Sequence, residues 1–321
     1  MYDVVALGEL LIDFSPAGLS EHGNYLFEQN PGGAPANVLV ACNRSGQTGA
    51  FIGMVGDDRF GSYLRDILIQ NQIGVDGLKF SGTVNTTLAF VHLDQNGDRS
   101  FSFYRKPGAD TMFTINDLKF PLIDSCKIFH FGSISMTHEP SRTTTIKAVE
   151  YAKAKGKLIS YDPNYRPSLW DCPQQAVQQM RAGVAFADVL KVSDEELMLL
   201  TECDCIEAGA QKLLESGVQL ICVTLGAKGC FYAHRHGTGY VPTYDVKVVD
   251  TTGSGDSFTG ALLSRLLQGQ QDIARLDSPQ LEQIMDYANA AGALCAAGRG
   301  AIPSIPVNAQ ILQCQKTIRK L

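Results

Sequence analysis

Short apolar runs alternate with longer segments of helical periodicity along most of this 321-residue chain, and this alternation limits the folds open to it. The runs with the length of strands are Val4–Leu7, Ala50–Val55, Ile128–Phe131, Leu158–Tyr161, Val189–Val192 and Leu220–Thr224. The helical patterns between them are Ala36–Arg44, Tyr63–Gln70, Arg142–Lys155, Ala176–Ala185, Glu195–Leu200 and Ile206–Leu214. Such alternation indicates a parallel sheet covered by helices on both faces. We therefore expect a three-layer α/β/α fold with a mostly parallel central sheet, whose ligands bind at the carboxyl ends of the strands.

One region breaks this alternation. Thr87–Leu93 and Ser100–Tyr104 read as two strands, and the Asn96-Gly97 pair between them is a strong hairpin signal. A hairpin cannot belong to a parallel core, but with Asn24–Glu28 it could form a small separate sheet. We expect a single domain, 1–321, with lid segments at about 14–30 and 86–105 inserted in it. The hairpin is then either a lid over a substrate cleft or an edge ornament.

Composition narrows the function classes. The length suits one large α/β domain. The net charge of −6, with no basic run, argues against nucleic acid as the main partner. No apolar stretch has the length of a membrane span, and the N-terminus lacks the basic region of a signal peptide. The nine cysteines are scattered, mostly among apolar residues, which favours a reducing compartment and a cytoplasmic location.

The segment Asp250–Phe258 carries the strongest functional signal. A strand-like run, Tyr244–Val249, precedes it, and helical periodicity follows it, so Gly253 and Gly255 lie at the start of a helix. Glycines there let backbone N–H groups approach an anion at the positive end of the helix. A carboxylate, Asp256, is useful in such a site if it takes a proton from a nucleophile that attacks a phosphoryl group. The alternative is a Gly-rich turn in which Asp256 only complements the helix dipole.

Two further motifs lie near the N-terminus. Asp13 follows the first strand, where the sheet would present it to a ligand. Pro31–Asn37 opens a helix, with Gly33 able to bring backbone close to a ligand and Asn37 in the first turn. A carboxylate, an amide and backbone groups together suit the recognition of a polyhydroxyl compound. Alternatively, Gly32-Gly33 is only a tight turn and Asn37 a helix cap.

Taken together, Gly8–Phe14, Pro31–Asn37, Gly53–Gly61 and Asp250–Asp256 resemble the motifs of the ribokinase-like (phosphofructokinase B type) carbohydrate kinases. The resemblance runs from Val4 to Pro303 and has four motifs in the same order. Within the family the chain is most similar to the fructokinase branch, and Asp162–Arg166 with Leu169-Trp170 adds to that likeness.

The resemblance implies a ribokinase-like fold and the transfer of the ATP γ-phosphoryl group to a sugar hydroxymethyl. It implies a catalytic set of Asp256 as base, the anion hole of Gly253, Ser254 and Gly255, and Arg166 near the phosphoryl group. It implies a sugar-binding set of Asp13, Gly32, Gly33, Asn37, Arg105 and Asn164. For the nucleotide and its magnesium it implies Ser193, Glu196, Thr224, Gly226, Gly229 and Asn289. Glu196 would order magnesium-bound water, and Ser193 stands where the family usually has Asn.

The family also commonly binds a monovalent cation, potassium, beside the anion hole. The matching positions would supply mostly backbone carbonyl oxygens, ligands that suit potassium, and they are Asp250, Thr252, Cys295, Gly298, Gly300 and Ser304. Asp250 would supply the charge; the alternative is an acid at a strand-end turn. The implied cofactors are therefore ATP, Mg²⁺ and K⁺.

Several functions stay open at this point. The leading one is an ATP-dependent sugar kinase, most closely a fructokinase. A kinase for another furanose-like substrate is the first alternative: ribose, a nucleoside, aminoimidazole riboside or 2-keto-3-deoxygluconate. A non-catalytic sugar-binding sensor is the alternative from another class, although a pure binder has no use for a base in an anion hole. Because the unpaired edges of a small sheet are a liability that a partner often covers, a homodimer through the lid is expected.

Overall fold

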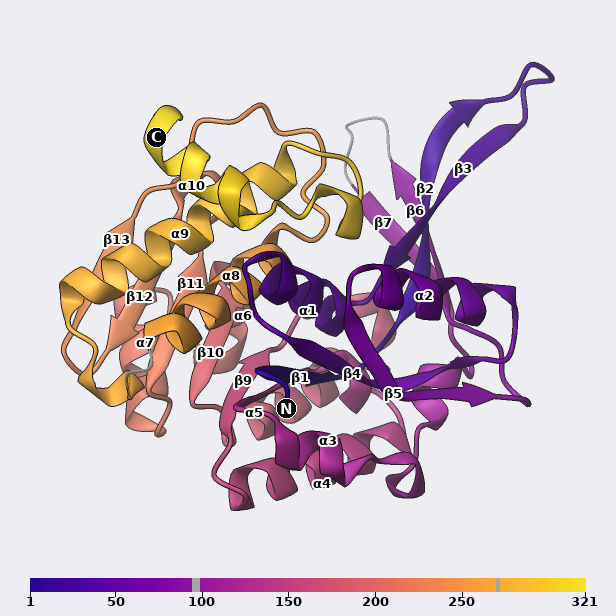
Figure 1. Ribbon diagram of the computed structural model, residues 1–321, viewed down its shortest axis with the longest axis horizontal. Helices are drawn as coiled ribbons and strands as arrows, with labels where there is room; N and C mark the ends of the chain where they lie inside the picture. The colour runs from indigo at the N-terminus through magenta and orange to yellow at the C-terminus, as the bar shows by residue number, and fades with distance from the viewer. Residues whose placement is uncertain (94–98, 270–271) are drawn as a thin grey trace.

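A large sheet forms the centre of the computed structural model, which describes residues 1–93, 99–269 and 272–321 (Figure 1). The strand order is β13-β12-β11-β10-β9-β8-β1-β4-β5. Neighbouring strands from β11 to β5 are parallel, whereas β12 and β13 are added antiparallel at one edge. The strands are β1 (Val4–Leu7), β4 (Gly49–Gly56), β5 (Ile73–Ser81), β8 (Ile128–Gly132), β9 (Leu158–Asp162), β10 (Val189–Ser193), β11 (Leu220–Thr224), β12 (Cys230–His234) and β13 (Gly237–Val241).

Helices cover both faces of this sheet, and each face has its own apolar core. One core takes its helical residues from α1 (Ala34–Arg44), α2 (Arg59–Gln70), α8 (Ser254–Gly269), α9 (Ser278–Ala296) and α10 (Asn308–Thr317). The other takes them from α3 (Phe120–Ser125), α4 (Ser141–Ala154), α5 (Pro173–Val184), α6 (Asp194–Thr201) and α7 (Ile206–Glu215). Strand β1 shows why the runs are wholly apolar: Val4 and Ala6 enter the first core, while Val5 and Leu7 enter the second. The fold is therefore the expected three-layer α/β/α arrangement.

A second, four-stranded sheet projects from this body beside α2 (Figure 1). Its strand order is β3-β2-β6-β7, and its strands are β2 (Leu11–Leu19), β3 (Tyr25–Gly32), β6 (Leu88–Leu93) and β7 (Arg99–Tyr104). On one face of this small sheet, aromatic rings pack together: Phe14 stacks on Phe90, which contacts Phe27 and Tyr104 edge-on. Asp13 precedes Phe14 in β2, so its side chain lies on the other face of this sheet.

The strands and helices predicted from the apolar pattern are confirmed: two strands have the predicted bounds, and the other boundaries shift by at most four residues. The hairpin is confirmed as β6 and β7, but its expected turn at Asn96-Gly97 lies outside the described residues. The prediction of a strand at Tyr244–Val249 is wrong, because this segment makes only an isolated bridge between Tyr244 and Lys320. Its alternating apolar side chains line a cavity instead of a sheet face.

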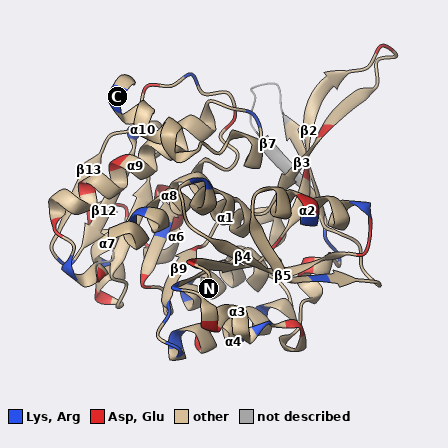
Figure 2. Cartoon of the chain, viewed as in Figure 1, with Lys and Arg blue, Asp and Glu red and all other residues tan. Residues whose placement is uncertain are grey.

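Polar loops follow the carboxyl ends of the parallel strands. In sheets covered by helices on both faces, ligands bind at this edge. Figure 2 shows Lys and Arg interspersed with Asp and Glu instead of gathered in one stripe. Within the described ranges, no helix is both long and apolar enough to cross a membrane.

Candidate active site

Helix α8 begins in a backbone conformation that only glycine adopts readily. Gly253, directly before Ser254, has a φ of +78°, and a Cβ on it would lie 2.7 Å from the Cβ of Ala301. The helix is 16 residues long, so its first turn presents unpaired N–H groups and the positive end of its dipole. Asp256 lies in that first turn. This arrangement can hold an anion next to a carboxylate.

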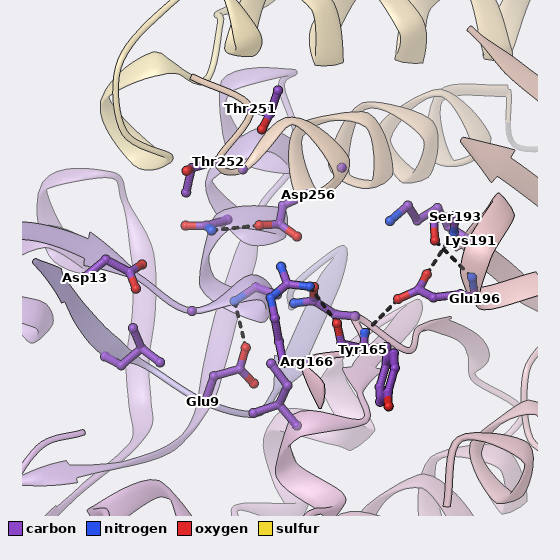
Figure 3. Close-up of a pocket in the computed structure, with 18 of the residues that line it drawn as sticks. Glu9, Asp13, Tyr165, Arg166, Lys191, Ser193, Glu196, Thr251, Thr252 and Asp256 are labelled. Carbon is purple, nitrogen blue, oxygen red and sulfur yellow. Dashed lines mark hydrogen bonds between the residues drawn. The ribbon is translucent and has the colours of Figure 1, made fainter. Parts of the chain in front are cut away.

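The Asp256 carboxylate is held by a residue from another helix. Asn37, in α1, donates from Nδ2 to Oδ2 of Asp256 over 2.7 Å (Figure 3). Burial raises the pKa of Asp256 to about 6, and the nearby charge of Asp162 adds to the increase, while Asn37, Lys191 and Arg166 oppose it. A carboxyl group with such a pKa is ionised at neutral pH and still basic enough to accept a proton from a hydroxyl.

Asp256 faces a cavity of about 430 Å³ that we call the polar cavity (Figure 3). It is lined mainly by polar and charged residues: Glu9, Asp13, Gly33, Asn37, Asn164, Tyr165, Arg166, Lys191, Ser193, Glu195, Glu196, Thr251, Thr252, Gly253, Gly255 and Asp256, with Leu11, Ala34, Phe103 and Ile134. Gly33 has a φ of +120°, and a Cβ there would collide with the backbone oxygen of Glu9. A Cβ on Gly32, just outside the lining, would collide with the Asp13 carboxylate. Both glycines thus keep this wall open.

Two polar groups on this wall suit a hydroxylated ligand. Burial raises the pKa of Asp13 to about 7, against the opposing charge of Arg166 and with that of Asp256. Oδ1 of Asn37 is buried and has no hydrogen-bond partner among the described residues, because Asn37 uses its nitrogen for Asp256. A buried acceptor without a partner costs about 1–3 kcal/mol. A ligand hydroxyl would remove that cost.

The opposite wall comes from the loop after β9. Asn164 has a left-handed φ of +50°, and its N–H donates to Oδ1 of Asp162 over 3.1 Å. Arg166 donates from Nη1 to the backbone oxygen of Tyr165 over 2.9 Å, and its guanidinium points toward Asp256 (Figure 3). The loop therefore places a cation beside the carboxylate.

A second cavity, of about 310 Å³, lies on the other side of the Asp250–Asp256 segment, and we call it the apolar cavity. It is lined by Thr224, Gly226, Ala227, Gly229, Thr243, Tyr244, Val246, Val248, Thr251, Ser254, Gly255, Phe258, Asn289, Gly292, Ala293, Ala296 and Leu321. Asn289 donates from Nδ2 to the backbone oxygens of Val241 and Pro242, at 2.9 and 3.3 Å, and so holds the cavity wall. Thr251 and Gly255 line both cavities. An anion at the start of α8 would therefore lie between the polar cavity and the apolar cavity.

Comparison with known proteins agrees with this geometry. A model of the pfkB family of carbohydrate kinases matches residues 1–308. The chain belongs to the pfkB family of carbohydrate kinases. It is 44% identical to fructokinase-1 of Zea mays over 97% of this chain and 96% of that protein.

Two solved fructokinase structures are also similar to this pfkB-family chain. One is a fructokinase with bound ATP from Xylella fastidiosa, with a TM-score of 0.91 and 35% identity over 98% of this chain and 99% of that one. The other is a double mutant of the fructokinase from Vibrio cholerae O395 with bound fructose, ADP and potassium ion, with a TM-score of 0.87 and 34% identity over 98% of each chain. The ribokinase-like fold expected from the sequence is thereby confirmed.

The polar cavity of this family member also contains the start of α6. Ser193 caps the helix: its side chain accepts the N–H of Glu196, and Oε2 of Glu196 accepts the N–H of Ser193 over 2.8 Å. Oε1 of Glu196 accepts the N–H of Tyr165 over 2.7 Å. The carboxylate is thus fixed in place, with lone pairs left for water. Among the described residues no group of three or more His, Cys, Asp or Glu could hold a metal ion alone.

The six residues expected around a monovalent cation come from the loop before α8, the last turn of α9 and the segment after α9. Asp250 accepts the N–H of Thr252 through Oδ1 (2.8 Å) and that of Gly300 through Oδ2 (3.1 Å). The Cys295 thiol lies 3.7 Å from the Thr252 carbonyl oxygen. A Cβ on Gly298 would collide with the hydroxyl of Ser304. The Asp250 carboxylate and the Thr252 carbonyl oxygen are hard oxygen ligands of the kind that potassium prefers.

Like Gly32, Arg105 is an expected sugar ligand that does not line the polar cavity. Its side chain is 3% exposed, its Nη2 pairs with Asp110 (2.7 Å), and its Nη1 donates to Thr137 (2.7 Å). Nη2 also donates to the Ile134 backbone oxygen over 3.0 Å. This guanidinium ties β7 to the body of the protein, and we leave it out of the sugar site.

Sequence reasoning missed three charged residues at this site. Glu9 follows β1 and accepts the N–H of Ala34 over 2.8 Å, and burial raises its pKa to about 7. Asp162 ends β9 and pairs with Lys191 in β10. The signals were available: two acids come directly at the ends of buried strands, and a lysine interrupts an otherwise apolar strand.

Proposed function

We propose that this protein is an ATP-dependent fructokinase, which transfers the γ-phosphoryl group of ATP to a hydroxymethyl oxygen of the sugar with Asp256 as the base. One observation carries the proposal: Asp256 lies in the first turn of α8, where the polar and apolar cavities meet. A sugar in the first cavity and a nucleotide in the second would bring their reacting groups together at that helix terminus.

The sugar occupies the polar cavity in this proposal. Its ring hydroxyls bind the Asp13 carboxylate, the free Oδ1 of Asn37, the backbone at Gly33 and the side chain of Asn164. Gly32 contributes by leaving room for Asp13. Because Asn37 holds the base through its other atom, sugar binding and base placement are linked.

The chemical step needs a base and a positive environment more than covalent chemistry. Asp256 takes the proton of the attacking hydroxyl, whose oxygen forms a bond to the γ-phosphorus. The bond between that phosphorus and the β–γ bridging oxygen breaks, and its electron pair leaves with ADP. The N–H groups of Gly253, Ser254 and Gly255 and the Arg166 guanidinium stabilise the charge on the transferred group. Exclusion of water by the small sheet acting as a lid favours transfer to the sugar over hydrolysis.

The nucleotide and its ions have matching positions. Thr224, Gly226 and Gly229 border the nucleotide in the apolar cavity, and Asn289 lies at its base-binding end. Glu196 and Ser193 would order the water around a magnesium ion, which, when bound, neutralises phosphate charge. Asp250, Thr252, Cys295, Gly298, Gly300 and Ser304 would hold potassium, which supports the anion hole from behind.

Fructose is the proposed acceptor because the similar proteins are fructokinases. The test is ADP release by the purified protein with a panel of acceptors: fructose, ribose, adenosine, aminoimidazole riboside and 2-keto-3-deoxygluconate. We expect the highest kcat/KM with fructose. A higher value with another acceptor would reassign the substrate within the same reaction class. Sugar binding in calorimetry without ADP release from any of them would instead indicate a non-catalytic sensor.

The proposal includes a homodimer through the small sheet. The face opposite Asp13 leaves Tyr104 67% exposed, and Tyr25 on the projecting hairpin is 82% exposed. Apolar surface of this kind on a small sheet with open edges suits a second copy of the chain. Sedimentation should therefore give a dimer, and the double change Leu19→Ser and Tyr25→Ser should shift it to monomer. A monomeric wild type at micromolar concentration would reject this assembly.

A further inference from the structure

A buried lysine lines the polar cavity without a role in the step described above. Lys191 belongs to β10 and is 8% exposed, although its neighbours Leu190 and Val192 are wholly apolar and buried. Those two neighbours enter the core on the α3–α7 side, so the alternation of the strand turns Lys191 toward the side of α8. A charge in the middle of a covered sheet is costly to keep. Its position therefore needs an explanation.

The ammonium lies between a carboxylate and the start of α8. Nζ of Lys191 is 3.1 Å from Oδ2 of Asp162, which is itself 3% exposed. A Cβ on Gly255 would lie only 3.0 Å from the same Nζ, so this nitrogen is next to the backbone of the anion site. Figure 3 shows the side chain reaching from β10 toward Asp256. Arg166 approaches Asp256 from the loop after β9, so two cations flank the base.

A purely structural ion pair explains this lysine less well. An ammonium has three N–H donors, and Asp162 is its one ion-pair partner in the described part of the chain. Donors thus remain on the side of the cavity. A buried pair also rarely repays its desolvation, so a sheet without an anionic ligand would be at least as stable with apolar residues here. The charges of Asp162, Glu196 and Asp256 nevertheless raise the pKa of Lys191 against the effect of burial, so it stays protonated.

We propose that Lys191 is a catalytic residue that donates hydrogen bonds to the γ-phosphoryl group during its transfer, and that Asp162 is the residue that positions it. This role rests on the proposed kinase function. Lys191 keeps its proton throughout: the proton of the sugar hydroxyl goes to Asp256, and the leaving electron pair goes to ADP. The ammonium stabilises an equatorial oxygen whose charge grows as the bond to ADP breaks. Asp162 acts only through the lysine and through the electrostatic field at Asp256.

The first test is the variant Lys191→Met beside the matched control Lys147→Met, which changes an exposed lysine of α4. Loss of one donor to a transition-state oxygen lowers kcat by about 10²- to 10³-fold, while the KM for fructose should change less than about threefold. The control should keep wild-type kinetics. Lys191→Arg should recover part of kcat, because it restores the charge with a different geometry.

A pH profile separates this role from simple packing. The groups that act on Asp256 include Asn37 from α1, Asp162 from β9, Arg166 and Lys191. Asp13 from β2 and Cys295 from α9 also interact with its charge, and both stay unchanged in the variants below. Since Lys191 lowers the pKa of Asp256 and Asp162 raises it, the acidic limb of log kcat/KM should move to higher pH in Lys191→Met and to lower pH in Asp162→Asn. If the two variants only lost packing, the acidic limb would not move in opposite directions in Lys191→Met and Asp162→Asn.

The double variant Asp162→Asn/Lys191→Met completes the design, because it removes both charges of the ion pair together. If Asp162 acts through Lys191, the double variant should have the same kcat as Lys191→Met. If Lys191→Met does not fold, the kcat of the double variant tests the role of Lys191 in its place. A folded variant without Lys191 that keeps more than a fifth of wild-type kcat overturns the role. If the wild type releases no ADP with any sugar, the proposed kinase function is wrong, and so is the role of Lys191. If the wild type is active but the variant without Lys191 keeps its kcat, only the role of Lys191 is wrong.

Discussion

The polar and apolar cavities share one wall, yet they are built from different chemistry. The polar cavity presents carboxylates, amides and cations, including Asp13, Asn37 and Arg166. The apolar cavity presents side chains such as Val246, Val248 and Phe258. Hydrogen bonds are directional, and a buried polar group that loses its partner is costly; apolar contact is spread over many atoms. Single changes in the polar cavity should therefore have large effects, and single changes in the apolar cavity small ones.

The largest effect is expected at the junction, in Asp256→Asn. The amide cannot accept the sugar proton, so kcat should fall at least 10²-fold, while fructose still binds because the cavity keeps its shape. Steady-state ADP release gives kcat, and calorimetry gives fructose affinity. More than a tenth of wild-type kcat would show that Asp256 is not the base.

A change within the polar cavity should act on the sugar alone. Asp13→Ala removes a charged hydrogen-bond partner, which costs about 1.5–3 kcal/mol, or roughly a 10- to 150-fold rise in the KM for fructose. The KM for ATP should change little, because Asp13 does not line the apolar cavity. Asp66→Ala, in the exposed part of α2, is the matched control. An unchanged sugar KM with an intact fold would place Asp13 outside the sugar site.

The acids of the polar cavity also predict the pH dependence. The pKa values of Asp256 and Asp13 are raised to about 6 and about 7, chiefly by burial. Both acids must be ionised to work, so kcat/KM should fall as the pH drops below about 7, and at pH 5 it should be roughly 10³-fold below its plateau. In Asp13→Asn only one protonation remains, and the acidic limb should become less steep. A limb near pH 4 in the wild type would contradict the burial of these groups.

The two cavities also differed in how well the sequence revealed them. Asn37 and Asp256, which line the polar cavity, could be singled out because each lies in the first turn of a helix, where the end of the element fixes the place of a side chain. Asp13 also lines the cavity, but it lies within β2 of the small sheet and not at the end of the first strand, where the sequence placed it. The apolar cavity was misread, since Tyr244, Val246 and Val248 alternate like a strand but line a cavity. Alternation of apolar residues with a period of two indicates that one side of an extended segment is buried. It does not indicate whether that side packs in a sheet or lines a cavity.

Contacts between distant segments were beyond sequence reasoning. The hydrogen bond from Asn37 to Asp256 joins α1 to α8. The ion pair between Lys191 and Asp162 joins β10 to β9, and the sequence does not show which strands are neighbours in the sheet. The family resemblance implied that Arg105 belongs to the sugar site. Its orientation depends on Asp110 and Thr137, which only the packed structure brings to it. The central strands and helices were predictable because their pattern is local.

A cation test addresses the wall behind the anion hole. If potassium binds at Asp250, Thr252 and their neighbouring carbonyls, it should raise kcat several-fold over sodium or tetramethylammonium at matched ionic strength. Asp250→Ala should lose this difference, because the carboxylate supplies the negative charge of the cluster. Equal wild-type rates in all three salts would remove the cation site and leave the comparison of the two cavities untouched.

The smallest effect should come from the apolar cavity. Val248→Ala removes two methyl groups from a side chain that is already 58% exposed, so only part of the roughly 0.8 kcal/mol per buried carbon is lost. The KM for ATP should rise about threefold, and the KM for fructose should stay constant. Val307→Ala, at an exposed residue directly before α10 that lines neither cavity, is the control. The KM for ATP in Val248→Ala could instead rise as much as the KM for fructose rises in Asp13→Ala. One residue would then dominate nucleotide binding. The proposed contrast between directional hydrogen bonds in the polar cavity and many small contacts in the apolar cavity would be wrong.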